Sequence, residues 1–505
     1  MPTREDQARV LVQESLNAVL SDDWETVLSD FVEAHIGPER AATWGPVDTS
    51  VNDIADFARQ VTTPGFYGMR PAVMNTEDPD AAERLIGEGG LLDAANLWNK
   101  LQHIEYMAVG MGEYLIRPTV DKTGLLGLRA VEPHWVYAES HPDDPSRPVV
   151  IGELRPRFLP RLDSWLWCWD HYSIKFGAEA YQVIAAEGKT GKGIAITKGD
   201  DLSADFLASE DNPEGDYTGA AYPFRWNGGT GYAYLPYAWY RSLDTMALWG
   251  FSQRRGPLRG TLNSGLLSTY AMQSARDATG RAIIAAGLMP MVGEVQDAGQ
   301  PNQVRSVVVK PGAIMYHQAM EGAQPFVQEI GPGAMLQQIS QYASQYSGRI
   351  ASRFGLNPEA ATRKAANPTS AAALAITDTQ RREFSAQLEP LFRASDLKLI
   401  RMIAALWNAA MAGDASPAMP ERGYTITYQA VPKTPDEMEA DREQWAWEEE
   451  RGLLSKIQLY QRQHPGATRD AALAALRQVA ADDAELSAVL PPDDDDEPDG
   501  GADEV

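Results

Sequence analysis

The sequence predicts a mixed α+β protein whose helices and short strands occupy separate stretches of the chain. Apolar residues recur every three or four positions in two long segments within 331–410, a pattern typical of amphipathic helices. Short apolar runs divided by turn sequences fill residues 113–185, which favours β-hairpins. With 505 residues, 44% of them hydrophobic, the chain is too long for one compact domain, and we expect two or three subregions.

Residues 5–61 are predicted to form three helices. Residues 22–25 have the spacing of a capping box, and Gly37-Pro38 should end the second helix. A loop then leads to a helix over 97–111, which Gly112 should close.

The β-rich stretch should run from Glu113 to about Ala185, followed by a Gly- and Asp-rich surface excursion over 187–222. Pro236 is predicted to open a helix that ends near Trp249. A longer helix is expected over 262–286, ended by Gly287.

Between this long helix and the next lies a compact insert, with strands expected at 304–309, 314–317 and 326–330. The helix that follows carries one narrow apolar stripe, while Gln, Ser and Arg cover its other face. Gly355 should end this helix in the left-handed conformation. The stripe consists of Leu336, Ile339, Ala343, Tyr346, Ile350 and Phe354.

Asn367-Pro368 is predicted to open a second long helix, kinked at Pro390. Its buried side should include Leu374, Phe384, Leu388, Leu391, Ile403 and Leu406. A short strand over 424–431 and three helices starting near residues 434, 453 and 468 should follow, before an acidic tail that lacks the apolar content to fold.

The net charge of −26 argues against a general phosphate-binding surface, because affinity for nucleic acid rests mainly on Lys and Arg. A protein of this charge that meets DNA should mostly repel it. Cys168 is the only cysteine, so no intrachain disulfide can form, and we expect a small buried hydrophobe there. The sequence contains neither an apolar run long enough to span a membrane nor a basic, apolar leader.

No catalytic or metal-binding pattern stands out. The seven histidines show no helical pairing, and no Gly-x-Ser-x-Gly elbow occurs, so we expect neither an enzyme nor a cofactor. Trp165, Trp167 and Trp169 should project from one face of a strand. Such a row could stack sugars or bases, but we expect it to pack under a helix.

Basic residues cluster around the turn that follows the striped helix, at Arg349, Arg353, Arg363 and Lys364. A basic turn in an otherwise acidic protein suits brief contacts with a polyanion.

The order of elements resembles that of tailed-bacteriophage portal proteins, the siphophage-like head-tail connectors. Residues 350–358, Ile-Ala-Ser-Arg-Phe-Gly-Leu-Asn-Pro, are similar to the run in which a helix of that family ends in Phe-Gly, a hydrophobic residue and proline. The stretch 369–388 and the phrase around Gly452-Leu453-Leu454-Ser455 fit the same pattern. The resemblance covers most of residues 97–479, whereas the helices before Thr63 are longer than the family pattern and the residues after Ala484 have no counterpart in it.

The resemblance implies a portal fold with an α/β wing, a two-helix stem, a small β-containing clip, a long kinked helix and a helical crown. The implied boundaries are wing 1–260, stem helices 261–287 and 331–355, clip 288–330, tunnel loop 356–368, long kinked helix with return strand 369–431, crown 432–484 and a disordered acidic tail 485–505.

It also implies a ring, twelve-fold in this family, at one capsid vertex of the virion, assembled in the host cytoplasm. Double-stranded DNA would pass through its channel during packaging and ejection. The terminase large subunit, the major capsid protein and a head-tail adaptor would be partners, and no membrane would be involved. The residues implied for the tunnel are Arg349, Arg353, Asn357, Arg363 and Lys364, and those for terminase or adaptor contact in the clip are Glu294, Gln296, Asp297, Gln300, Gln303 and Arg305.

Two other functions stay open. The thirteen tryptophans and many carboxylates are compatible with a carbohydrate-binding or carbohydrate-active protein, which would bring two acids into a cleft beside the Trp165–Trp169 row. A cytosolic helical adaptor with an acidic tail would instead present an apolar groove and no ring-forming surface.

Overall fold

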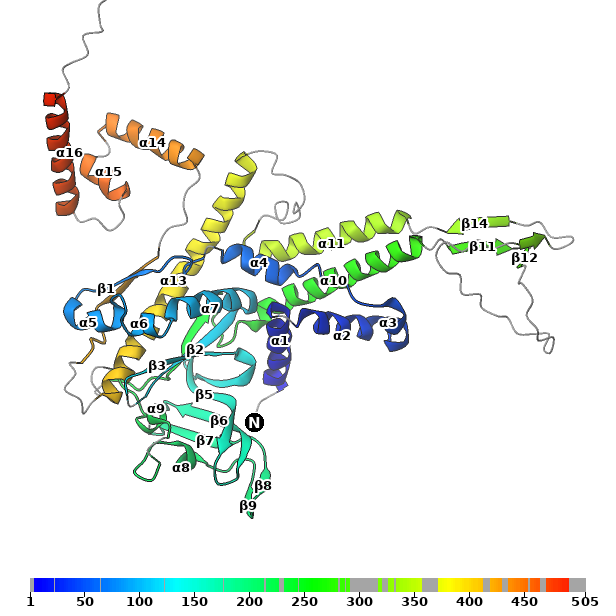
Figure 1. Cartoon of the computed structure of the whole chain (residues 1–505), viewed down its shortest axis with the longest axis horizontal. Helices are drawn as coiled ribbons and strands as arrows, with labels where there is room; N and C mark the ends of the chain where they lie inside the picture. The colour runs from blue at the N-terminus through cyan, green and yellow to red at the C-terminus, as the bar shows by residue number, and fades with distance from the viewer. Residues whose placement is uncertain are drawn as a thin grey trace, which may run out of the picture. The chain divides into compact units, whose positions relative to one another are not determined.

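A computed structural model of the chain shows a mixed α+β protein, as predicted (Figure 1). The chain divides into two compact units, Met1–Val431 and Pro432–Val505. The structure describes residues 4–21, 23–63, 65–121, 123–175, 177–212, 215–226, 231–243, 245–279, 282–286, 288–290, 317–319, 326–330, 333–356, 371–411, 418–428, 435–452, 455–463 and 469–489.

The N-terminal region forms four helices where three were predicted. They are α1 (Arg4–Leu20), α2 (Trp24–Ile36), α3 (Pro38–Trp44) and α4 (Asp53–Val61). Gly37, at a φ of +84°, ends α2 as expected, but Pro38 then occupies the first position of a further helix. The side chain of Asn52 caps α4 by accepting the N–H of Ala55 at 3.2 Å.

The predicted loop before residue 97 holds structure of its own. It contains β1 (Ala72–Asn75), α5 (Pro79–Ile86) and α6 (Leu91–Ala94). Strand β1 pairs antiparallel with β15 (Tyr424–Thr427), which lies about 350 residues later in the chain. The helix predicted over 97–111 is confirmed as α7 (Leu97–Met111), and Gly112 caps it at a φ of +96°.

The predicted β-rich stretch is confirmed and forms parts of two sheets. One has the order β10-β2-β3 and the other β4-β5-β6-β7, while β8 and β9 form a separate hairpin. The strands are β2 (Glu113–Val120), β3 (Leu126–Val131), β4 (Val136–His141), β5 (Asp144–Leu159), β6 (Ser164–Ser173), β7 (Ala180–Ala185), β8 (Lys189–Gly191) and β9 (Ile194–Ile196). Short helices lie at η1 (Pro133–Trp135), α8 (Ser203–Phe206) and α9 (Tyr217–Ala220).

The helix predicted from Pro236 to Trp249 is wrong. Residues 238–241 form strand β10 (Ala238–Arg241), which pairs antiparallel with β2. Ala238 and Tyr240 pack into one hydrophobic core, whereas Tyr237 and Trp239 pack into a second. Because both faces of this strand are buried, its sequence lacks the polar alternation that marks a half-buried strand.

The predicted long helix is displaced toward the N-terminus. Helix α10 spans Phe251–Thr279 and accommodates Pro257 near its start, whereas residues 282–286, expected to be helical, form strand β11 (Ala282–Ala286). Strand β14 (Phe326–Ile330) confirms one predicted strand and pairs with β11. Strands β12 (Leu288–Pro290) and β13 (His317–Ala319) also pair. The strand predicted at 304–309 lies outside the described residues, as do residues 314–316 of the strand predicted at 314–317, whose last residue, His317, begins β13.

Helix α11 (Gly333–Arg353) packs alongside α10 (Figure 1). The start of α10 contacts the end of α11, through Arg254 with Phe354 and Gly260 beside Ile350, so the two helices run antiparallel. The predicted stripe is confirmed for its described side chains. Ile350 and Phe354 are buried and Ile339, Ala343 and Tyr346 are half-buried, whereas the flanking Gln and Arg side chains are exposed. Gly355, at a φ of +68°, follows the helix.

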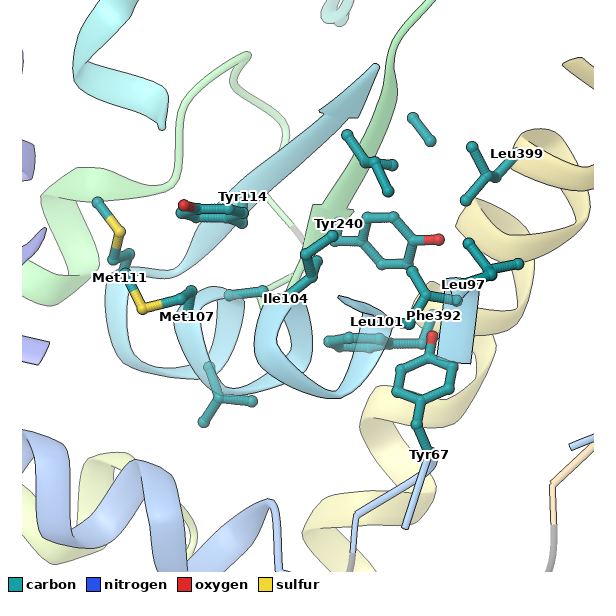
Figure 2. Close-up of a cluster of buried hydrophobic side chains, with 14 of the residues drawn as sticks. Tyr67, Leu97, Leu101, Ile104, Met107, Met111, Tyr114, Tyr240, Phe392 and Leu399 are labelled. Carbon is teal, nitrogen blue, oxygen red and sulfur yellow. The ribbon is translucent and has the colours of Figure 1, made fainter. Parts of the chain in front are cut away.

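Helix α13 (Ala371–Ala410) contains Pro390 and contributes to the main core of the first unit. Figure 2 shows Leu97, Leu101 and Ile104 of α7 gathered near Tyr240 and near Phe392 and Leu399 of α13. Among the predicted buried positions of α13, Leu388, Ile403 and Leu406 are buried and Phe384 and Leu391 half-buried. Asn367-Pro368 and the Leu374 side chain lie outside the described residues.

The second unit contains the three predicted C-terminal helices. They are α14 (Pro435–Glu450), α15 (Lys456–Gln463) and α16 (Arg469–Val489). The expected start of a disordered tail at residue 485 is wrong, because α16 continues to Val489. Residues 490–505 lie outside the described part of the chain.

Candidate polyanion-binding groove

A groove of ≈ 730 Å³ lies between the start of α10 and the end of α11. Glycine and proline bring the two helices close together here. A Cβ atom on Gly260 would lie 3.0 Å from Cδ1 of Ile350, so the apolar stripe of α11 rests against a position of α10 that carries no side chain. The groove is lined by Leu243, Ser252, Gln253, Arg254, Gly256, Pro257, Arg259, Gly260, Asn263, Tyr346, Arg349, Ile350, Ser352 and Arg353.

Both helices contribute arginines to this groove. Arg254 and Arg259 come from α10, and Arg349 and Arg353 come from α11. Arg259, Arg349 and Arg353 are exposed, and none of the described residues that line the groove is an Asp or Glu. A patch with a single sign of charge in a chain of net charge −26 creates a local positive potential that attracts anions.

Arg254 lies at the base of the groove with only 1% of its surface exposed. Its Nη2 donates to Oγ of Ser242 at 3.2 Å, and its guanidinium lies 4.4 Å from the ring centroid of Phe354. Its Nε has no hydrogen-bond partner, and no described carboxylate forms an ion pair with it. Burial lowers the pKa of Arg254 to about 10, so the side chain is still charged at neutral pH.

The structure brings together two of the five residues implied for the tunnel. Arg349 and Arg353 both line the groove. Asn357, Arg363 and Lys364 lie outside the described residues, as do all six residues implied for the clip: Glu294, Gln296, Asp297, Gln300, Gln303 and Arg305.

Sequence reasoning missed Arg254 and Arg259. The signal was present, because Arg254, Arg255 and Arg259 form a basic segment in an acidic chain. The long helix was predicted to begin only at residue 262, so these arginines were not placed on a helix that could face Arg349.

A second surface feature is the aromatic row on β6. Trp165 is 61% exposed and Trp167 37% exposed, so the expectation that this row packs under a helix is wrong. Trp167 stacks on Trp135 with ring centroids 5.3 Å apart, and Trp165 meets Phe158 edge-on. The alternate side chains of the strand, including Cys168 and Asp170, point into the buried interior.

Two carboxylates beside this row are engaged in local hydrogen bonds. Glu132 accepts the indole N–H of Trp135 at 3.0 Å, and Glu187 accepts the backbone N–H of Trp167 at 3.1 Å. These contacts orient the aromatic row and do not form a pair of acids facing a shared cleft.

Cys168 is fully buried, as predicted, and burial raises the pKa of its thiol to about 11. Within the described parts of the chain, His, Cys, Asp and Glu side chains form no group that could hold a metal ion. No helix built from described residues is long and apolar enough to cross a membrane. No protein-family model matches the chain, and no curated protein matches it either.

Proposed function

We propose that this chain is a subunit of a bacteriophage portal ring, through which double-stranded DNA passes during packaging and ejection. The terminase large subunit, the major capsid protein and a head-tail adaptor would be its partners at the capsid vertex of the virion, after assembly in the host cytoplasm. The function is structural rather than enzymatic. The proposal rests on the order of elements: an α/β region, helix α10, a pair of short antiparallel ladders, the returning helix α11 and the long helix α13.

The arginine groove between α10 and α11 is the single observation that supports a DNA conduit most strongly. Tight binding along a channel would stall DNA, because each phosphate contact adds to the affinity. An acidic chain with a confined cluster of exposed arginines in this groove offers weak, reversible contacts there.

The surface of α11 also suits assembly. The buried part of α11 lies mainly toward its end, around Ile350 and Phe354, and the opposite face carries exposed Gln, Ser and Arg. A polar face of this kind can meet neighbouring copies in a closed ring or line a wet bore.

Fluorescence anisotropy with a labelled DNA duplex at low salt tests the role of the groove. Changing Arg259, Arg349 and Arg353 together to Gln should weaken binding and reduce the slope of log affinity against log salt by about 0.9 for each DNA phosphate that the variant no longer neutralises. A matched control changes three exposed arginines that already pair with acids, Arg70, Arg161 and Arg462. An equal loss of binding in both triple variants would contradict a specific role for the groove.

A second candidate function is carbohydrate binding at the aromatic row, favoured by the exposure of Trp165 and Trp167. Exposed indoles stack on the apolar faces of sugar rings. Titration with soluble oligosaccharides, followed by tryptophan fluorescence, should then show saturable quenching that the Trp165→Ala variant loses. Unchanged fluorescence across a panel of neutral and acidic oligosaccharides would rule this function out.

A further inference from the structure

A small cavity of ≈ 260 Å³ lies between α13 and strand β10. Leu391, Ala394, Ser395 and Lys398 recur at helical spacing and present one face of α13 to it. The opposite wall comes from β10 and its neighbours, namely Ser146, Pro148, Ile151, Leu235, Tyr237, Trp239 and Arg241.

Lys398 has no partner within the described chain, since it makes no hydrogen bond and no ion pair there. The charged side chains that act on it most strongly are Arg241 and Arg147, both cationic. Burial together with these two cations lowers the pKa of Lys398 to about 8. Placing a half-buried ammonium close to other cations is costly, and an anion bound beside it would relieve that cost.

Lys398 also lines a second, wider hollow. It contains Glu77 and Glu421 together with Arg401 and Arg422, and neither acid forms an ion pair with Lys398. The ≈ 260 Å³ cavity differs because none of the described residues that line it is acidic.

Trp239 supplies an unused hydrogen-bond donor in the wall of this cavity. It is 9% exposed and packs against Trp249 with ring centroids 4.6 Å apart, yet its indole Nε1–H has no acceptor. A buried N–H without an acceptor costs free energy, and such groups in native structures commonly mark a bound molecule.

Arg241 is held in place beside this donor. Its Nη2 donates to the backbone oxygens of Ser146 at 3.1 Å and Leu248 at 2.9 Å, and its guanidinium lies 4.9 Å from the ring centroid of Trp239. Its charge also acts on the buried carboxyl of Glu113, which does not line the cavity. The residues that line the cavity therefore include a guanidinium held in place, a lysine ammonium and a tryptophan whose indole N–H has no acceptor in the described chain.

We propose that Lys398, Trp239 and Arg241 form a binding site for the phosphate group of a small molecule. A phosphate group carries close to two negative charges at neutral pH and offers three acceptor oxygens, which matches two cations and one neutral donor. A carboxylate carries one charge and offers only two acceptor oxygens, so it matches these three donors less well. The cavity is too small for a DNA duplex, so this site is independent of the proposed passage of DNA.

The test is a brief acetylation of the full-length protein near pH 8, with the label on each lysine measured by mass spectrometry. Lys398 should react readily when free, because a lowered pKa leaves more of the amine unprotonated. Inorganic phosphate or a nucleoside monophosphate should protect Lys398 saturably. Lys192, which pairs with Asp163 at 3.0 Å and is exposed, serves as the internal control and should be unaffected.

The Trp239→Phe variant retains an aromatic ring but lacks the indole N–H. It should require about tenfold more phosphate for the same protection of Lys398, the scale of one hydrogen bond to a charged group. Protection by the monophosphate alone would identify a phosphate ester, and protection by inorganic phosphate as well would identify the phosphate group itself. Equal protection by acetate or by a DNA duplex, or no protection by either phosphate compound, would overturn the proposal.

Discussion

The guanidinium of Arg254 lies 4.4 Å from the ring centroid of Phe354 and joins the first turns of α10 to the end of α11. Phe354 is itself fully buried and also meets Phe57 of α4, with ring centroids 6.3 Å apart. This contact fixes the base of the arginine groove, because Arg349 and Arg353 lie within the last turns of the helix that Phe354 anchors.

Removing the Phe354 ring should therefore destabilise the first unit. Phe354→Ala is expected to lower the free energy of unfolding by about 3–5 kcal/mol, because the variant buries less apolar surface and leaves a cavity in the core. Tyr342→Ala on the same helix is the control, since that side chain is 59% exposed, and it should change the stability by less than about 0.5 kcal/mol. Urea denaturation measures both variants, and equal effects would show that Phe354 does not anchor α11.

Gly355 combines a left-handed backbone with a close neighbour. Its φ is +68°, and a Cβ atom there would lie 2.5 Å from Cδ2 of Phe384. Gly193 has a similar φ of +76° with no atom near its Cβ position. Gly193→Ala should cost about 1 kcal/mol from backbone strain alone.

Gly355→Ala should cost more, by roughly a further 1–3 kcal/mol, because the added methyl group clashes with Phe384. Thermal unfolding of the two variants against the parent protein separates strain from clash. If Gly355→Ala is no more destabilising than Gly193→Ala, the packing of Phe384 against the turn after α11 does not matter for stability.

Glu105 and Asp396 are two of the buried carboxyls, besides Glu113, that make the stability of the first unit depend on pH. Burial raises the pKa of Glu105 to about 8 and that of Asp396 to about 6. Glu105 accepts the backbone N–H of Phe66 at 3.0 Å. Asp396 accepts hydrogen bonds from the hydroxyl groups of Tyr67, Tyr240 and Tyr428.

In both cases the folded state holds a proton at pH values where the unfolded chain has already released it. The free energy of unfolding should therefore fall as the pH rises from about 4.5 to about 8, by about 1.4 kcal/mol for each unit of pKa difference. Glu105→Gln should flatten this decline, especially above pH 6. Urea denaturation at several pH values measures the slope, and a stability that increases over this range would contradict the assignment.

The sequence predicted α11 well because the pattern there is local. The stripe through Ile350 and Phe354 has helical spacing, and Gly355 marks the end of the helix. Strand β10 was missed because Tyr237 and Trp239 face one core while Ala238 and Tyr240 face another, so the strand shows no alternation of apolar and polar residues.

Half of the groove was missed for a different reason. Arg349 could be singled out from its own segment. Its position in one groove with Arg254 and Arg259, however, depends on the packing of two helices whose groove residues lie about ninety positions apart in the chain. Nothing in a local pattern shows that two such segments face each other. The exposure of Trp165 was likewise set by tertiary structure, because no helix covers that side chain in the described part of the chain.

The most direct test of the proposed function is electron microscopy of the purified full-length protein, with end-on views averaged by class. A portal subunit should form closed rings of uniform stoichiometry, twelve-fold by the resemblance, with an axial channel wide enough for a DNA duplex of about 20 Å. Particles that remain monomeric across protein concentration, salt and temperature, or that assemble without a central channel, would contradict it.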